Sequence, residues 1–115
     1  MDEITVSAIK KSLDSLALRQ TYLAQNIANA NSPGYQSVKV QFEEQLAIAA
    51  AGGVDEIEAL QPEVSQEVRA GVSPDMRLDL ELAQSAQTAM RYSALINVLG
   101  RQMSMLMSVV RGGQQ

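Results

Sequence analysis

The sequence contains no cysteine, no histidine and no tryptophan. Without cysteine the chain can form neither a disulfide nor a thiolate metal site. Without histidine it lacks the commonest metal ligand and general base. No glycine-rich loop of the kind that cradles phosphates is present either. We therefore predict no metal, no cofactor and no enzymatic activity.

Positive charge is also scarce. Nine Lys and Arg stand against thirteen Asp and Glu, which gives a formal net charge of −4. No cluster of Lys and Arg could neutralise a phosphate backbone, so we predict no nucleic-acid partner. The opening MDEITVSAIKKSLDSL has two acids where a secretory signal would have a basic region, so we expect no cleaved signal peptide.

A long uninterrupted apolar run is missing as well. The most apolar region, from Ala94 to Val110, is broken by polar residues, namely Asn97, Arg101, Gln102, Ser104 and Ser108. A membrane-spanning helix needs about 20 predominantly apolar residues, so we predict no membrane insertion.

What the chain does have is aliphatic character. Its 115 residues are 46% hydrophobic, yet only three Tyr and one Phe are aromatic. Ala, Leu, Val, Ile and Met in such proportions favour helix packed on helix, in a single domain. We predict an all-α chain in which two long terminal helices pack as a coiled-coil-like pair around an irregular, partly extended middle segment.

The first helix is predicted from about Glu3 to Ala30. Its apolar residues repeat at spacings of three and four with one polar interruption, in the series Val6, Ile9, Leu13, Leu16, Gln20, Leu23, Ile27 and Ala30. An ordinary two-helix core and an extended coiled coil both fit this seam. Leu18 and Tyr22 lie nearly opposite it, which makes them candidates for contacts with other subunits.

The middle segment has weaker patterns. Alternation at Val38, Val40 and Phe42 favours a short strand, and Glu43 to Ala51 is a short helix stopped by Gly52-Gly53. From Val54 to Ser73 we predict an acidic surface linker, mobile in the isolated chain. Within it, a series of alternating residues indicates a short β excursion: Val64, Gln66, Val68 and Ala70.

The second long helix has two possible starts. Ser73-Pro74 could cap it, but RLDLEL alternates like a strand, and we favour a cap at Asp79. The predicted seam runs through Leu82, Ser85, Ala89, Tyr92, Ile96, Leu99, Met103, Leu106 and Val110. Val98, Met105 and Val109 form an apolar shoulder outside that seam, wider than one partner helix requires. We predict that this shoulder meets other subunits.

One stretch, LAQNIANANSPGYQ from Leu23 to Gln36, joins the first helix to the middle segment. Asn29, Asn31 and Ser32 have short polar side chains that compete with helical hydrogen bonds, and Pro33 forbids continuation of the helix. Pro33-Gly34 suits the central positions of a type II turn, where the second residue needs positive φ. The pattern alone predicts a well-defined helix end.

The letters of that stretch go further. QNIANANSPGYQ closely resembles the N-terminal signature of the bacterial flagellar axial proteins, the rod, hook and hook-associated subunits. The residues in matching places are Asn26, Ile27, Ala28, Asn29, Ala30, Asn31, Pro33, Gly34 and Tyr35, with Ser32 where threonine is commoner. The C-terminal AMRYSALINVLGRQMSMLMSVVRGG is similar to the same family's tail, with Tyr92, Leu95 and Leu99 matching. Short length and this tail are most similar to the proximal rod proteins.

The resemblance implies a structural subunit that assembles helically into the flagellar rod, the drive shaft of the periplasmic basal body. The implied partners are copies of itself, other rod subunits, the membrane-ring protein and the adaptor to the export gate. The implied route is the flagellar type III export apparatus, without a cleaved leader. By this resemblance Asn26, Asn29, Asn31, Pro33, Gly34 and Tyr35 are assembly residues.

We therefore divide the chain into an N-terminal rod-core helix (1–32), a middle segment (33–78) and a C-terminal rod-core helix (79–115). The alternative hypothesis is a soluble helical adaptor or secretion chaperone, a binding module that stays in the cytoplasm. Composition does not separate the two functions. The LAQNIANANSPGYQ signature favours the rod subunit, because a chaperone would have no reason to carry it.

Overall fold

The structure, a computed structural model, describes residues 1–68 and 71–113. In chain order its elements are α1 (Glu3–Ala28), β1 (Val38–Gln41), α2 (Glu43–Gly52), α3 (Val54–Ala59), β2 (Glu63–Gln66) and α4 (Pro74–Gly112). The molecule is a flat rod with principal extents of 65 × 28 × 15 Å. The two long terminal helices of the predicted all-α chain are confirmed, and a small two-stranded sheet in the middle makes the chain mostly α.

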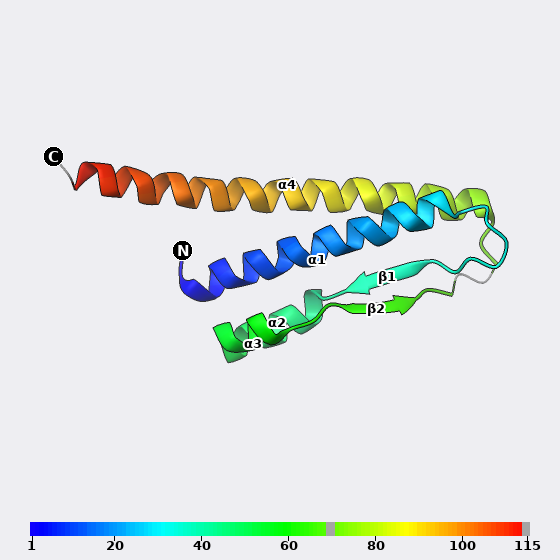
Figure 1. Cartoon of the computed structure of the whole chain (residues 1–115), viewed down its shortest axis with the longest axis horizontal. Coiled ribbons are helices and arrows are strands. Elements are labelled where there is room, and N and C mark those ends of the chain that lie inside the picture. The colour runs from blue at the N-terminus through cyan, green and yellow to red at the C-terminus, as the bar shows by residue number, and fades with distance from the viewer. Residues whose placement is uncertain (69–70, 114–115) are drawn as a thin grey trace.

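The helix α1 lies in the middle of three layers (Figure 1). On one side α4 runs antiparallel to it. On the other side lie the two-stranded sheet of β1 and β2 and the two short helices that connect these strands. Asp2 caps the start of α1 by accepting a hydrogen bond from the Thr5 backbone N–H at 2.7 Å. Because it has partners on both sides, α1 supplies more buried apolar side chains than any other element described here.

The predicted seam of α1 is confirmed in its buried members. Ile9, Leu13, Leu16, Leu23 and Ala30 are all at most 9% exposed. A second buried stripe contains Ser15 and Asn26, both polar. This stripe serves the second partner of α1, the middle segment.

The middle segment is more regular than predicted. The strand at Val38–Gln41 and the helix ending at Gly52 are confirmed, and β2 pairs antiparallel with β1, with Val40 opposite Val64. The prediction of an irregular linker from residue 54 is wrong for α3, whose Ile57 is fully buried. The predicted β excursion is confirmed at Val64 and Gln66. It is wrong for Val68, which lies beyond the end of β2 and is 79% exposed, and Ala70 lies outside the described residues.

The helix α4 begins at Pro74, so the predicted cap at Asp79 is wrong. The Ser73 side chain accepts a hydrogen bond from the Met76 backbone N–H at 3.2 Å, and proline occupies the first helical turn. This capping chemistry prevails over the strand-like alternation that follows it. With 39 residues against 26 in α1, α4 extends past the N-terminus of α1 at its far end (Figure 1).

The face that α4 turns toward α1 also differs from the predicted seam. Ser85 and Leu99 do lie on the covered side, but Leu82, Ile96, Met103, Leu106 and Val110 are between 43% and 58% exposed. The covered side of α4 shares only Ser85 and Leu99 with the predicted seam. Its residues are Leu78, Glu81, Ser85, Thr88, Leu95, Leu99 and Gln102. The seam was misplaced because α4 is apolar around much of its circumference, so apolar periodicity does not identify the side that meets α1.

Burial of Ile57 provides a test of the fold of the middle segment. We expect Ile57→Ala to lower the free energy of unfolding by about 2–5 kcal/mol, because it leaves a cavity between α3 and α1. The control is Ile48→Ala, the same chemical change at a side chain that is 67% exposed, which should cost far less. Urea unfolding followed by circular dichroism measures both, and equal effects would mean that α3 does not pack as described.

Candidate assembly site

Asn26 is the centre of the turn region. Its side chain is 2% exposed and makes every hydrogen bond that an amide can make. Its Nδ2 donates to the Val38 carbonyl at 2.8 Å and to Glu81 Oε2 at 3.2 Å. Its Oδ1 accepts from the Tyr35 hydroxyl at 2.8 Å and from the Val38 N–H at 3.0 Å. One side chain therefore joins α1, the turn, β1 and α4.

The α4 side of this cluster is charged. Glu81 is 1% exposed, and one turn earlier Arg77 Nη2 donates to the carbonyl of Ala30 at 2.7 Å. That bond satisfies a carbonyl just beyond the C-terminal end of α1. Burial raises the pKa of the Tyr35 phenol, and the nearby charge of Glu81 raises it further. The hydroxyl consequently stays protonated at neutral pH and can donate to Asn26.

The predicted turn is confirmed in its geometry. Gly34 has φ of +75°, and the Tyr35 N–H donates to the Ser32 carbonyl at 3.2 Å. These are the features of a type II turn with Pro33 and Gly34 at its centre. The turn reverses the chain and brings Tyr35 back over Asn26.

The other two asparagines of the signature lie at the surface. Asn29 ends α1, where its Nδ2 donates to the Gln25 carbonyl at 2.9 Å and its Oδ1 accepts from the Ser32 hydroxyl at 3.2 Å. Asn31 and Pro33 are exposed. Intrachain hydrogen bonds or the turn geometry account for Asn26, Asn29, Gly34 and Tyr35. The assignment of the signature to subunit contacts stays a prediction.

Arg19 holds the same strand further along. Its Nη2 donates to the Val40 carbonyl at 2.6 Å and to Glu43 Oε2 at 2.9 Å. Burial opposes ionisation of Glu43, but hydrogen bonds and the charge of Arg19 prevail and lower the pKa of that carboxyl. Together Asn26 and Arg19 satisfy the backbone of Val38 and Val40 on the edge of β1 that faces away from β2.

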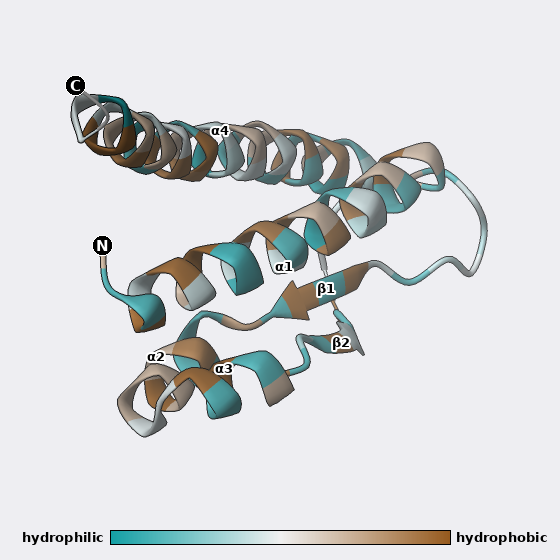
Figure 2. Ribbon diagram, turned by 60° about the vertical axis from the view of Figure 1, so that its left-hand side comes forward, coloured by the Kyte–Doolittle hydropathy of each residue, from teal (hydrophilic) through white to brown (hydrophobic). Residues whose placement is uncertain are grey.

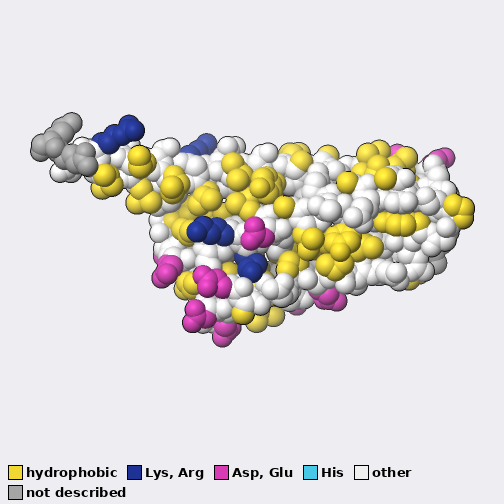
Figure 3. All heavy atoms as spheres, viewed as in Figure 1, with side chains coloured by type: hydrophobic (Ala, Val, Ile, Leu, Met, Phe, Trp, Pro, Cys, Tyr) yellow, Lys and Arg dark blue, Asp and Glu magenta, His cyan; other side chains and the backbone are white. Residues whose placement is uncertain are grey.

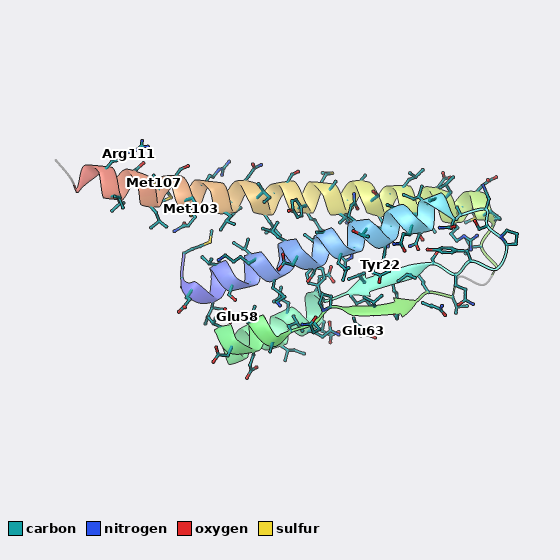
Figure 4. The ribbon with its side chains drawn as sticks, viewed as in Figure 1. Tyr22, Glu58, Glu63, Met103, Met107 and Arg111 are labelled. Atoms are coloured by element: carbon teal, nitrogen blue, oxygen red, sulfur yellow. The ribbon has the colours of Figure 1, made fainter. Side chains whose placement is uncertain are left out.

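Leu18 and Tyr22 are half-buried. On the helix they share a stripe with Lys11 and Ser15, and Lys11 Nζ donates to the carbonyls of Glu58 and Leu60, both at 3.0 Å. The stripe therefore faces the middle segment, as Tyr22 does in Figure 4. The sequence suggested a free face there because the middle segment was not recognised as a second partner for α1.

The shoulder of α4 is uncovered. Val98 is 40% exposed, Met105 64% and Val109 72%. Most of the large apolar side chains exposed on the described part of the chain belong to α4, whose ribbon carries hydrophobic residues, drawn in brown, along its length (Figure 2). The two buried residues of α4, Glu81 and Thr88, are polar. This distribution is the reverse of that on an ordinary surface helix.

By length and composition alone, α4 could also cross a membrane, with none of its apolar window buried inside the molecule. A helix that packs against other subunits meets the same test. Within residues 1–68 and 71–113 no group of three or more acidic side chains is placed to hold a metal ion.

Sequence reasoning missed the buried partners on α4 and β1. A cap at Asp79 would put Glu81 in the first turn of the helix, and no sequence pattern described above singles out Arg19 or Arg77. Glu81 carries no local signal of burial, since it alternates with leucines in LDLELA just as the exposed Asp79 does. Its partner Asn26 could not be identified, because 55 residues separate the two.

The chain is similar to known proteins over nearly its whole length. It is 29% identical to the flagellar basal body rod protein FlgB of Salmonella typhimurium over 125 residues, covering 90% of this chain and 91% of that protein. FlgB of Yersinia enterocolitica is 26% identical with the same coverage. FlgB of Borrelia hermsii is 43% identical over 44 residues, covering 38% of this chain and 33% of that protein. No family model matches the sequence.

The hydrogen bonds of Asn26 predict that replacing its amide nitrogen with oxygen, in Asn26→Asp, strongly lowers the stability of the chain. In Asn26→Asp the two donated bonds are lost and a carboxylate faces Glu81. We expect the free energy of unfolding to fall by roughly 3 kcal/mol or more at neutral pH. Asn31→Asp, the same change at an exposed residue of the same signature, is the matched control and should alter it little. Similar losses in the two variants, measured by urea unfolding, would contradict this role for Asn26.

The turn predicts a second effect. Gly34→Val forces a β-branched residue to positive φ, although its side chain would meet no neighbouring atom. We expect a cost of about 1–3 kcal/mol from backbone strain, with the helical content of α1 and α4 nearly unchanged. Because the strain displaces Tyr35, amide exchange should quicken at Val38, whose N–H is bound to Asn26. Unchanged exchange there would show that the turn does not position the cluster.

Proposed function

Since the chain is a FlgB-like flagellar rod protein with a structural role in the basal-body rod, we propose that it is a subunit of the proximal rod that assembles helically through α1 and α4. The observation that carries the proposal is the uncovered apolar surface of α4. In space-filling view, yellow side chains run along the whole length of this helix (Figure 3). A surface of this extent is buried by neighbours in a working protein.

The two terminal helices have different tasks in this assembly. The helix α1 is covered on both sides by its own chain, so it acts chiefly as the scaffold. The helix α4 is covered on one side only and offers its remaining surface to other subunits. Among the described residues, no other layer lies beside the end of α4 that extends past α1 (Figure 1), and this end presents Met107 and Val109 to any neighbour.

We further propose the partners and the route that the rod family implies. The partners are copies of this chain, other proximal rod subunits, the membrane-ring protein and the export-gate adaptor. The route is flagellar type III export with no cleaved leader. Mass spectrometry of subunits recovered from purified basal bodies checks the route, since removal of the N-terminal residues as a leader would contradict it.

Two aspartate substitutions on α4 separate assembly from folding. Met105→Asp puts a carboxylate on the uncovered side of α4, so the purified monomer should keep its helical circular dichroism. In a subunit contact that unpaired charge costs several kcal/mol, enough to stop incorporation into basal bodies and swimming. Leu99→Asp is the counterpart on the covered side and should destabilise the monomer itself.

The outcome that contradicts the proposal is clear. If a strain carrying only Met105→Asp swims and builds basal bodies normally, the uncovered side of α4 is not a subunit contact. If the wild-type chain is recovered from cell membranes stripped of basal bodies, α4 is a membrane helix instead.

A further inference from the structure

Charge is segregated along this chain. Residues 43–67, which comprise α2, α3 and β2, contain seven acidic residues and no Lys or Arg. We call this segment the acidic arm. Residues 82–113, the larger part of α4, contain three arginines and no Asp or Glu. The two stretches have opposite charge, and each also exposes apolar side chains.

The acidic arm and α4 lie on opposite sides of α1 (Figure 1). In space-filling view, magenta side chains cluster on the arm at the lower edge and arginines mark the upper edge of α4 (Figure 3). Arg91 and Glu43 form one ion pair between the two regions, with Arg91 Nη1 and Glu43 Oε1 3.6 Å apart. Glu58 and Arg111, labelled in Figure 4, point away from each other, so these two charges do not pair within the chain. A second copy displaced sideways across the long axis brings its arm toward the outer face of α4.

The outer face of α4 has a shape that suits such a neighbour. A shallow hollow is lined by Ile96, Asn97, Gly100, Arg101, Ser104 and Met105. Gly100 forms part of its floor, and a Cβ there would meet no described atom within 4 Å outside its own stretch of helix. Glycine inside a helix is unfavourable by about 1 kcal/mol relative to alanine, and no close contact among the described residues requires it.

The acidic arm has a matching projection. Ile48 is 67% exposed on α2, one turn after the exposed Glu44. An apolar side chain beside a carboxylate is complementary to an apolar hollow beside an arginine. Because α2 carries acidic side chains and no basic one, a basic surface on another molecule complements its charge.

We propose, deepening the proposed rod function on which this rests, that the outer face of α4 receives the acidic arm of a second copy of this chain. In this contact Ile48 enters the hollow over Gly100 and Glu44 faces Arg101. The two surfaces differ, so the contact is head-to-tail: each copy uses its arm on one neighbour and its α4 on another. Contacts of this kind build an open helical assembly, as a rod requires, when the rotation between neighbours does not close into a ring.

Cysteine cross-linking tests the contact directly, because the chain has no native cysteine. Ile48→Cys and Ser104→Cys copies, carrying tags of different size, are expressed together in a strain without its own copy. A short bismaleimide applied to isolated basal bodies should give a mixed dimer. The control pair replaces Ser104→Cys with Leu80→Cys, an exposed position at the other end of α4, and should give none.

Failure of this inference differs from failure of the proposed function. If the cysteine copies enter basal bodies but the Ile48–Ser104 pair gives no mixed dimer, or no more than the Leu80 control, the arm does not meet α4. If wild-type chain is absent from basal bodies, the proposed function itself is wrong.

Charge exchange tests the same contact by a second route. We expect Arg101→Glu to lower the recovery of subunits in basal bodies about tenfold, and Glu44→Lys in the same chain to restore it. The control is Lys10→Glu, the same charge reversal at an exposed residue of α1, which should leave recovery unchanged. Circular dichroism confirms that each purified monomer is folded. Loss without restoration by Glu44→Lys would overturn the pairing.

Discussion

The hydrogen bonds of one buried amide set the arrangement of this molecule. Asn26 is the only side chain described here that bonds to both β1 and α4 and receives the turn tyrosine. A buried amide that lost these partners would incur the full desolvation penalty of its unpaired atoms, on the order of 1–3 kcal/mol. The Asn26 amide is therefore fully hydrogen-bonded only when the turn, β1 and the start of α4 are all in place. The NIANANSPGY segment supplies both Asn26 and the turn that positions Tyr35 over it.

Because polar side chains make the buried contacts of α4, most of its large apolar side chains are not buried within the chain. Three hydrogen bonds hold the N-terminal part of α4: Arg77 donates to the Ala30 carbonyl, Asn26 donates to Glu81, and Gln20 donates to the Ser85 carbonyl. Apolar packing adds to this mainly through Leu95 and Leu99, which are half-buried. The rest of the apolar surface remains available for other subunits. If the proposed assembly is correct, the stability of the monomer and its affinity for neighbours depend on different residues of one helix.

The sequence predicted the elements that are specified locally. The end of α1 and the type II turn follow from short polar side chains and Pro33-Gly34, and the short helix stops at its glycines as expected. The pairing of distant segments was not predictable in the same way. Glu81 and Asn26 are far apart in sequence, and nothing in the acid's own neighbourhood indicates burial. Likewise α3 is only six residues long, too short for a period to be recognised, and its position depends on the burial of Ile57 against α1.

The error in the seam of α4 reveals why the buried polar residues are needed. A helix that is apolar around much of its circumference can pair with α1 in several rotations of similar hydrophobic free energy, so burial of area does not select one. Hydrogen bonds do select, because a rotation of about 100° would remove Glu81 from Asn26 and Ser85 from Gln20 at once. A single buried polar residue fixes register in coiled coils by the same reasoning. Here the selected rotation leaves Leu82, Ile96 and Met103 about half exposed, and in the proposed assembly such side chains would contact neighbouring subunits.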